Sequence, residues 1–209
     1  MEKKKDLLLD IDEVFCFSGL LEAINDFLGS NYAIDDFSDY YIDEVAIPKE
    51  RFDEFNKFLS KRNLYETAQI LPYARETLKK LDEVYNIYVC SSCINPFDIA
   101  NSGRLFADKY NFLITSIPFI KPEQFIFTSA KHLYRADIQI DDRLSNLDEH
   151  IETRILFPSY HNKNITDEEL IEKGILRAGY DWRTGWLEVA NILLGTSNKV
   201  DNNVKCLKK

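Results

Sequence analysis

The sequence predicts an α/β fold, in which helices cover both faces of a mostly parallel sheet and a small helical cap is inserted after the first strand. Short apolar segments alternate with longer amphipathic ones over most of the 209 residues, a pattern typical of βαβ units. Two apolar segments end in pairs of aspartates, at the edge where open sheets of this class bind ligands. Residues 30–70 are rich in tyrosine, phenylalanine and aspartate and break the alternation, which predicts the cap.

The predicted cap follows a first strand expected at 6–10. Apolar residues recur with helical spacing over 19–28, and Gly29 is placed to end that helix. A second helix is expected at 50–61, where phenylalanines recur on one side. We therefore divide the chain into a core formed by 1–18 and 71–195, a helical cap at 19–70, and a polar tail at 196–209 that we expect to be disordered.

The predicted core resumes after Pro72. Helices are expected at 74–84, 97–110 and 182–194, with a further helical stretch at 128–134. Strands are expected where short apolar runs separate these helices, at 87–90, 112–116, 125–127, 137–140 and 154–157.

Length and composition limit the classes of function. A chain of 209 residues has room for one main domain and a small insertion. The formal charge of −9, from 26 basic and 35 acidic residues, argues against a nucleic-acid polymer as partner. We find neither an apolar run long enough to span a membrane nor the apolar segment of a secretory signal. The sequence thus predicts a cytoplasmic protein with no membrane partner.

The first pair of aspartates closes the first predicted strand. Asp10 and Asp12 are two residues apart, so an extended backbone places both side chains on the same face. Two neighbouring carboxylates at a strand end are costly unless a cation or a proton lies between them. The pair therefore indicates a metal-assisted site in which one aspartate is a nucleophile or a ligand.

Three further polar features follow in a fixed order. Ser91 and Ser92 come directly after the strand expected at 87–90. Asp141 and Asp142 close the strand expected at 137–140, and Lys131 precedes Asp141 by ten residues. Each feature is weak alone, but the ordered set of aspartates, serine, lysine and aspartates, each near the end of an apolar run, is strong evidence for one site.

This set resembles the haloacid dehalogenase (HAD) superfamily of phosphotransferases, which implies a Rossmann-like core. The segment 63–72, Lys131 with Asp141-Asp142-Arg143, the triplet Tyr160-His161-Asn162 and the pair Asp181-Trp182 further resemble the 5'(3')-deoxyribonucleotidase family. The resemblance covers about 6–195. It implies a phosphoric monoester hydrolase that uses Mg²⁺ and acts on deoxyribonucleoside monophosphates, and it suggests a homodimer.

The resemblance also implies a role for each residue of the ordered set. Asp10 would attack phosphorus and form an aspartyl-phosphate, and Asp12 would be the general acid and base. Lys131 and Ser91 would stabilise the phosphoryl oxygens. The Mg²⁺ ligands would be the Asp10 carboxylate, the Asp12 backbone carbonyl and Asp142, with Asp141 alongside.

Substrate contacts are expected from Ser92, Arg104, Ser18 and Tyr65. Arg104 lies near the position of a phosphate-binding lysine in the resembled family. Tyr65 lies where the cap returns to the core, and its ring could stack on a base while its hydroxyl stays in water. His161 is interpreted as a structural loop residue.

Two departures from the family pattern leave the preferred base and sugar open. Glu13 stands where the family usually has glycine. Phe17 and Ser18 stand where the family has an acidic residue followed by an aromatic one that contact the nucleotide.

Other functions remain as alternatives. The chain could be a HAD phosphatase for another small phosphate ester, or a HAD-fold binding protein without activity. Cys90 and Cys93 form a CxxC pair, which also occurs in redox and zinc sites. No second CxxC or histidine pair completes a zinc site, so we interpret Cys90 as a buried strand residue and Cys93 as a loop residue.

Overall fold

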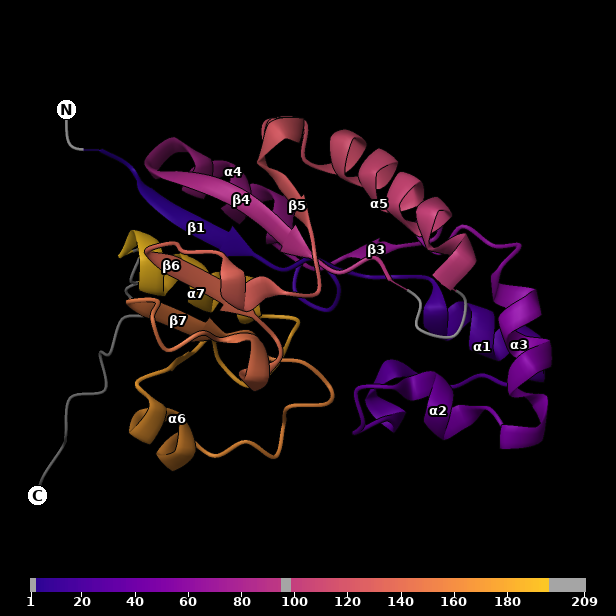
Figure 1. Cartoon of the computed structure of the whole chain (residues 1–209). Coiled ribbons are helices and arrows are strands. Elements are labelled where there is room, and N and C mark those ends of the chain that lie inside the picture. The colour runs from indigo at the N-terminus through magenta and orange to yellow at the C-terminus, as the bar shows by residue number, and fades with distance from the viewer. Residues whose placement is uncertain (1–2, 95–98, 196–209) are drawn as a thin grey trace, which may run out of the picture.

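The computed structural model of the chain describes residues 3–94 and 99–195 (Figure 1). Within these residues the main sheet has six parallel strands in the order β5-β4-β1-β6-β7-β8. The strands are β1 (Lys5–Leu9), β4 (Tyr85–Ser91), β5 (Phe125–Phe127), β6 (Ile138–Asp141), β7 (Thr153–Leu156) and β8 (Leu176–Arg177). The predicted α/β class with a parallel sheet is confirmed. The predicted tail at 196–209 lies outside the described residues.

β1 lies inside the sheet, and the chain extends the sheet from it in two directions. β4 and β5 are added on one side, and β6, β7 and β8 on the other. The strand order therefore reverses between β1 and β6, which is where open α/β sheets bind ligands, outside the carboxyl ends of the strands. The fold thus brings the segments that follow β1 and β6 to one place.

Both faces of β1 are buried, as expected for a central parallel strand. Leu7 and Leu9 belong to the largest core cluster, which also contains residues of α4 (Ala74–Val84), α5 (Ser102–Ser116) and α7 (Gly185–Leu194). Leu8 faces the opposite side and packs with Cys90 and Ile151. On that side α6 (Asp167–Lys173) packs its Leu170 against Leu156 of β7.

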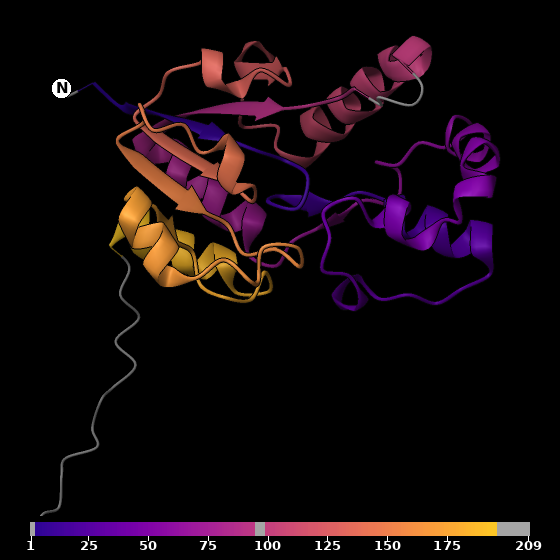
Figure 2. The same cartoon turned by 60° about the horizontal axis from the view of Figure 1, so that its bottom comes forward.

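The segment of residues 16–70 forms a separate group of helices. Its two ends pair as antiparallel strands, β2 (Cys16–Phe17) and β3 (Gln69–Ile70). Between them lie α1 (Leu20–Leu28), α2 (Ile42–Ala46) and α3 (Phe52–Leu59), which Figures 1 and 2 show together beyond one end of the main sheet. α1 ends at Gly29, whose φ of 67° suits glycine. This arrangement supports our proposal that 19–70 serves as the cap.

The helical group has its own small core. The buried residues of this core are Ile24, Phe37, Ile42, Ile47, Phe55 and Tyr160. Tyr160 comes from the loop after β7, so one side chain of the main domain is packed inside the cap. No helix in the described part of the chain is long and apolar enough to cross a membrane.

Four expected elements differ from the structure. In its described part, the helix expected at 97–110 starts as a 3₁₀ turn, Ile99–Asn101, and continues as α5 from Ser102. The strand expected at 112–116 is the last part of α5, which buries Lys109, Leu113 and Ser116 with helical spacing. The helical stretch expected at 128–134 is reduced to one 3₁₀ turn, Lys131–Leu133. The last helix begins three residues later than expected, at Gly185.

Some short elements were not predicted. Among them, α6 begins at Thr166, whose hydroxyl accepts a hydrogen bond from the Glu169 amide, and ends at Gly174 with φ of 64°. Cys90 is a buried residue of β4 and Cys93 is buried in the following loop, in agreement with our interpretation. Cys206 lies outside the described residues.

Candidate active site

The carboxyl ends of three neighbouring strands place the predicted site residues together. Asp10 follows β1, and its amide donates a 3.1 Å hydrogen bond to the Ile140 carbonyl of β6. Asp141 is the last residue of β6, and Ser91 is the last residue of β4. Because β1 pairs with both β4 and β6, the three side chains converge at the point where the strand order reverses.

Lys131 lies between the two acidic pairs. Its Nζ is 2.9 Å from Asp10 Oδ1 and 2.7 Å from Asp141 Oδ2, and the side chain is buried. Burial alone would lower the pKa of Lys131, but the two carboxylates outweigh burial and raise it. Lys131 is therefore a fixed positive charge beside Asp10, although it belongs to a short turn rather than to the helix expected from the sequence.

Asp141 and Asp142 lie beneath the same edge of the sheet and are almost fully buried. Burial raises the pKa of both carboxyls, and the neighbouring Asp10 adds to the shift. Asp141 Oδ1 accepts hydrogen bonds from the Arg143 amide at 3.0 Å and from Asn146 Nδ2 at 2.9 Å, while Oδ2 contacts Lys131. The protein thus engages both oxygens of Asp141.

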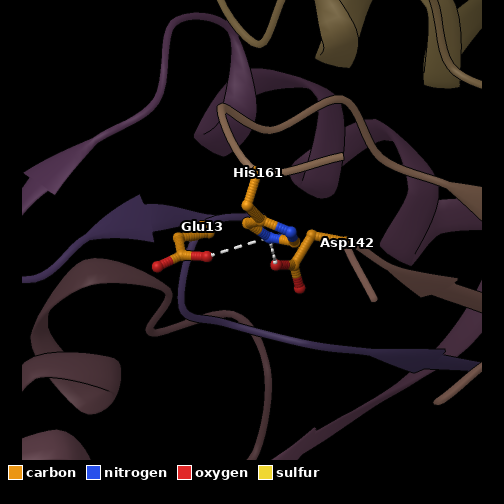
Figure 3. Close-up of side chains that lie close together, drawn as sticks. All are labelled: Glu13, Asp142 and His161. Atoms are coloured by element: carbon orange, nitrogen blue, oxygen red, sulfur yellow. Dashed lines mark hydrogen bonds and ion pairs between the residues drawn. The ribbon is translucent and has the colours of Figure 1, made fainter. Parts of the chain in front are cut away.

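Asp142 is held by a histidine. His161 Nε2 lies 2.6 Å from Asp142 Oδ2 and 3.2 Å from Glu13 Oε2 (Figure 3). Asn162 donates a 2.7 Å hydrogen bond to the Asp142 carbonyl, which fixes the backbone of this residue as well. His161 therefore contacts the side chain of a predicted metal ligand, beyond the structural role we expected for it.

Lys109 is a site residue that the sequence analysis missed. Its Nζ contacts Asp12 Oδ2 at 2.6 Å, Ser91 Oγ at 2.9 Å and the Ser92 carbonyl at 2.6 Å, and the side chain is 1% exposed. Burial lowers the pKa of Lys109, but nearby Asp12 outweighs burial and raises it. One signal could have identified it, namely a lysine on the buried face of an amphipathic helix.

Arg104 also belongs to α5 but lies one and a half turns before Lys109. Its guanidinium donates to the Ser60 carbonyl at the end of α3 and pairs with Asp108. Ser92 Oγ exchanges a 2.8 Å hydrogen bond with Ser129 Oγ. Of the two basic residues of α5, Lys109 is the one that contacts Asp12 and Ser91, while Arg104 joins the helix to the cap segment.

Tyr65 contacts the predicted general acid directly. Its hydroxyl donates a 2.8 Å hydrogen bond to Asp12 Oδ1, and its ring centroid is 5.5 Å from that of Phe112. Burial raises the pKa of Tyr65 well above its ordinary value. Our expectation that the hydroxyl stays in water is wrong, because the returning cap segment turns it inward onto Asp12.

The site residues line one cavity of about 510 Å³ between the sheet edge and the cap segment. Its wall includes eight predicted site residues: Asp10, Asp12, Ser18, Tyr65, Ser91, Ser92, Arg104 and Lys131. Asp141 and Asp142 lie behind this wall. The cap segment contributes Tyr40, Tyr41 and Arg62, and Arg143 of the core lies with its guanidinium 4.2 Å from the Tyr40 ring centroid. The cavity lining thus combines charged residues of the sheet edge with aromatic and basic side chains of the cap segment.

Comparison with known proteins gives the family. The model of the family described as "5' nucleotidase, deoxy (Pyrimidine), cytosolic type C protein" matches residues 4–174. The chain belongs to this family. The membership confirms the class of enzyme that the motifs predicted, a phosphoric monoester hydrolase.

Relatives with this family's activity in their names occur in several bacteria. A 5'(3')-deoxyribonucleotidase of Clostridium acetobutylicum is 31% identical over 106 residues, 51% of this chain and 54% of its own. A Staphylococcus aureus protein (strain MSSA476), provisionally named a 5'(3')-deoxyribonucleotidase, is 29% identical over 163 residues, 77% of this chain and 86% of its own.

A solved structure has a similar fold. A haloacid dehalogenase-like hydrolase from Streptococcus pneumoniae superimposes with a TM-score of 0.51 at 13% identity, over 90% of this chain and 98% of that one. At this identity the likeness shows the fold alone, and the predicted HAD-like fold is confirmed.

The acidic cluster of this 5'-nucleotidase family member fits a hard divalent cation. Oxygen atoms of Asp10, Asp141 and Asp142 lie within 4.8 Å of one another, and all three residues are buried. Burial and repulsion from Asp10 raise the pKa of Asp141 and Asp142, so a cation bound among the three carboxylates would stabilise their ionised forms. Carboxylate oxygens are the ligands that Mg²⁺ prefers.

Proposed function

We propose that the protein is a Mg²⁺-dependent 5'-nucleotidase that hydrolyses deoxyribonucleoside monophosphates to nucleoside and phosphate through an aspartyl-phosphate. The observation that carries the proposal is the position of Asp10. Its carboxylate lies on the cavity floor at the strand-order reversal, 2.9 Å from Lys131 and grouped with two further buried carboxylates. A phosphate ester bound there would meet a nucleophile and fixed positive charge at once.

The two chemical steps would be divided between Asp10 and Asp12. Asp10 attacks phosphorus, the bond from phosphorus to the 5' oxygen breaks, and Asp12 gives the leaving oxygen its proton. A water molecule then attacks the aspartyl-phosphate, and Asp12 accepts its proton. Both oxygens of Asp12 accept hydrogen bonds here, from Tyr65 and Lys109, so these two residues would orient it for both transfers.

The phosphoryl oxygens would be stabilised by the groups around them. Lys131 and the Ser91 hydroxyl face the floor of the cavity, and Lys109 holds Ser91 at 2.9 Å. Asp10 and Asp142 would hold Mg²⁺, which would supply positive charge that offsets the charge of the phosphate. The hydrogen bonds favour Asp142 over Asp141 as its direct ligand, because both oxygens of Asp141 already contact Lys131, Arg143 and Asn146.

The cavity supports a substrate that carries a ring. Tyr40 and Tyr41 line its far wall, and Ser18, Ser92 and Arg104 lie around its sides. Aromatic side chains stack on bases of any sequence. The names of the relatives point to the same class of substrate. That the protein acts in the cytoplasm remains a prediction from the sequence. The same is true of the homodimer.

A panel of phosphate esters tests the proposal. Phosphate release should be measured from deoxyribonucleoside 5'- and 3'-monophosphates, the ribose equivalents and sugar phosphates, each with Mg²⁺ and with EDTA. We expect release from the deoxyribonucleotides only with Mg²⁺. Faster release from the sugar phosphates would favour the alternative HAD phosphatase. Absence of release from every ester, by folded protein with Mg²⁺, would favour a binding protein.

A further inference from the structure

Glu13 has a backbone conformation that side chains disfavour. Its φ is 64°, a left-handed value that glycine adopts readily, and Tyr73 is the other non-glycine residue with positive φ in the described part of the chain. Such strain persists where surrounding contacts hold the residue, and it occurs often at functional sites. The contacts of the Glu13 side chain therefore show what holds it.

The Glu13 carboxylate joins two consecutive residues of the loop after β7. Oε1 accepts a 2.9 Å hydrogen bond from the Tyr160 hydroxyl. Oε2 lies 3.2 Å from His161 Nε2, the nitrogen that also contacts Asp142 (Figure 3). Oε2 is buried and accepts no hydrogen bond from the described residues, so His161 Nε2 is the polar atom placed to hold it.

His161 lies between two carboxylates, those of Asp142 and Glu13, and one ring nitrogen, Nε2, faces both of them. These two contacts outweigh the effect of burial and raise the pKa of His161. Figure 3 shows the second oxygen of Asp142 pointing away from His161.

The same contacts reach the cap. The Tyr160 hydroxyl is also 3.0 Å from the Tyr40 carbonyl, and the Tyr160 ring is buried in the small core of the cap. The Tyr40 ring lies edge-on to His161, with centroids 5.1 Å apart, and lines the cavity. One carboxylate therefore connects Asp142 with the cap wall of the cavity.

We propose that Glu13 is a positioning residue with two effects: it orients the Asp142 carboxylate through His161, and it fixes the Tyr40 wall of the cavity through Tyr160. The first effect rests on the proposed function, in which Asp142 is a ligand of the catalytic cation. A ligand held by a hydrogen bond on one oxygen presents the other in a fixed direction, and loss of such partners typically weakens metal binding.

Calorimetric titration with Mg²⁺ tests the first effect without relying on turnover. We expect Glu13→Gly and His161→Ala to weaken Mg²⁺ binding about 10–100-fold, the usual range for partners of metal ligands. His161→Gln, which keeps a neutral donor, should restore most of the loss. If His161 did not orient Asp142, the two variants at 161 would leave Mg²⁺ binding unchanged or strengthen it. That result, or unchanged affinity in folded Glu13→Gly, would overturn the first effect.

Tyr160→Phe tests the second effect. We expect faster hydrogen exchange of the amides of residues 38–47 and a higher KM for a deoxyribonucleoside monophosphate, with a much smaller change in Mg²⁺ affinity than in Glu13→Gly. Unchanged exchange and KM would overturn the link to the cap. Tyr73→Gly is the matched control, because it relieves the same backbone strain at an exposed residue outside the cavity. It should change neither the Mg²⁺ affinity nor KM.

These measurements separate the two proposals. If wild-type protein releases no phosphate from nucleotides, the proposed function fails. The Mg²⁺ affinities of Glu13→Gly, His161→Ala and His161→Gln, measured by calorimetry, still decide whether Glu13 and His161 position Asp142.

Discussion

At the scale of single residues, Asp10 is the most demanding test of the proposed chemistry. Asp10→Asn keeps the size of the side chain but removes the nucleophilic carboxylate and one candidate metal ligand. We expect phosphate release to fall below detection while circular dichroism shows a folded protein. Near-normal turnover by folded Asp10→Asn would exclude the aspartyl-phosphate mechanism.

Lys109 and Arg104 allow a comparison within one helix. Lys109→Met keeps the apolar stem but leaves Asp12 and Ser91 without their shared donor, so we expect kcat to fall about 10²-fold or more, as for other residues that support proton transfer. Arg104→Met removes a partly exposed side chain that contacts neither of them, and it should change mainly KM. Steady-state kinetics on one nucleotide would check both, and equal effects on kcat would contradict the assignment.

The contrast between these two residues shows what the sequence could predict at this scale. Asp10, Ser91 and Asp141 were predictable because the carboxyl ends of adjacent parallel strands meet at one edge. Lys109 was not, because its importance depends on which face of a helix is buried and on how that helix lies against Asp12. Tyr65 was placed near the site, but the direction of its hydroxyl depends on the path of the returning cap segment.

At the scale of elements, α5 shows why a run of apolar residues is ambiguous. Phe112, Leu113 and Ile114 form a short apolar run that favours a strand, yet the structure continues the helix through them. The buried positions 102, 109, 113 and 116 follow the helical repeat, and that repeat becomes visible only when Lys109 is counted as a buried residue. The helix at 74–84 had an unambiguous repeat and was predicted with its observed ends.

Two neighbouring substitutions in this run test the helix. Leu113 is fully buried, whereas Ile114 is 36% exposed. Leu113→Ala should lower the free energy of unfolding by about 2–5 kcal/mol through lost packing. Ile114→Ala should lower it by only about 1 kcal/mol, because the side chain is partly exposed and alanine favours helices. Urea denaturation would measure both, and similar losses at the two positions would contradict the described burial.

At the scale of the whole molecule, the cap segment is joined to the core by contacts of different strength. The chain enters and leaves the cap segment through the paired strands β2 and β3. Tyr160 of the core is buried in the small core of the cap. Asp35 of the cap pairs with Lys163 and Arg183 of the core at the surface. The sequence predicted the insertion from its break in alternation, but these contacts lie 120 to 150 residues apart in the chain and left no local signal.

The Asp35 pairs should contribute little, and their contribution has a defined pH dependence. Hydrogen bonds from Arg183 and Lys163 lower the pKa of Asp35 below its ordinary value of 3.8. The stabilisation is therefore complete above the unfolded pKa and is lost as the pH falls through the lower folded pKa. Because the side chains are exposed, Asp35→Asn should cost only about 0.2–1 kcal/mol at pH 7. That loss corresponds to a fall in Tm of at most about 4 °C for a chain of this size.

Salt gives an independent measurement of the same contribution. Thermal unfolding of wild-type and Asp35→Asn protein should be compared at pH 7 in 0.05 M and 1 M NaCl, since screening weakens exposed pairs. The difference in Tm between the two proteins should shrink in high salt. A difference that is large and independent of salt would mean that Asp35 supports the packing of the cap. The attachment of the cap would then depend on this surface contact as well as on Tyr160, and Asp35→Asn should also raise KM for the nucleotide.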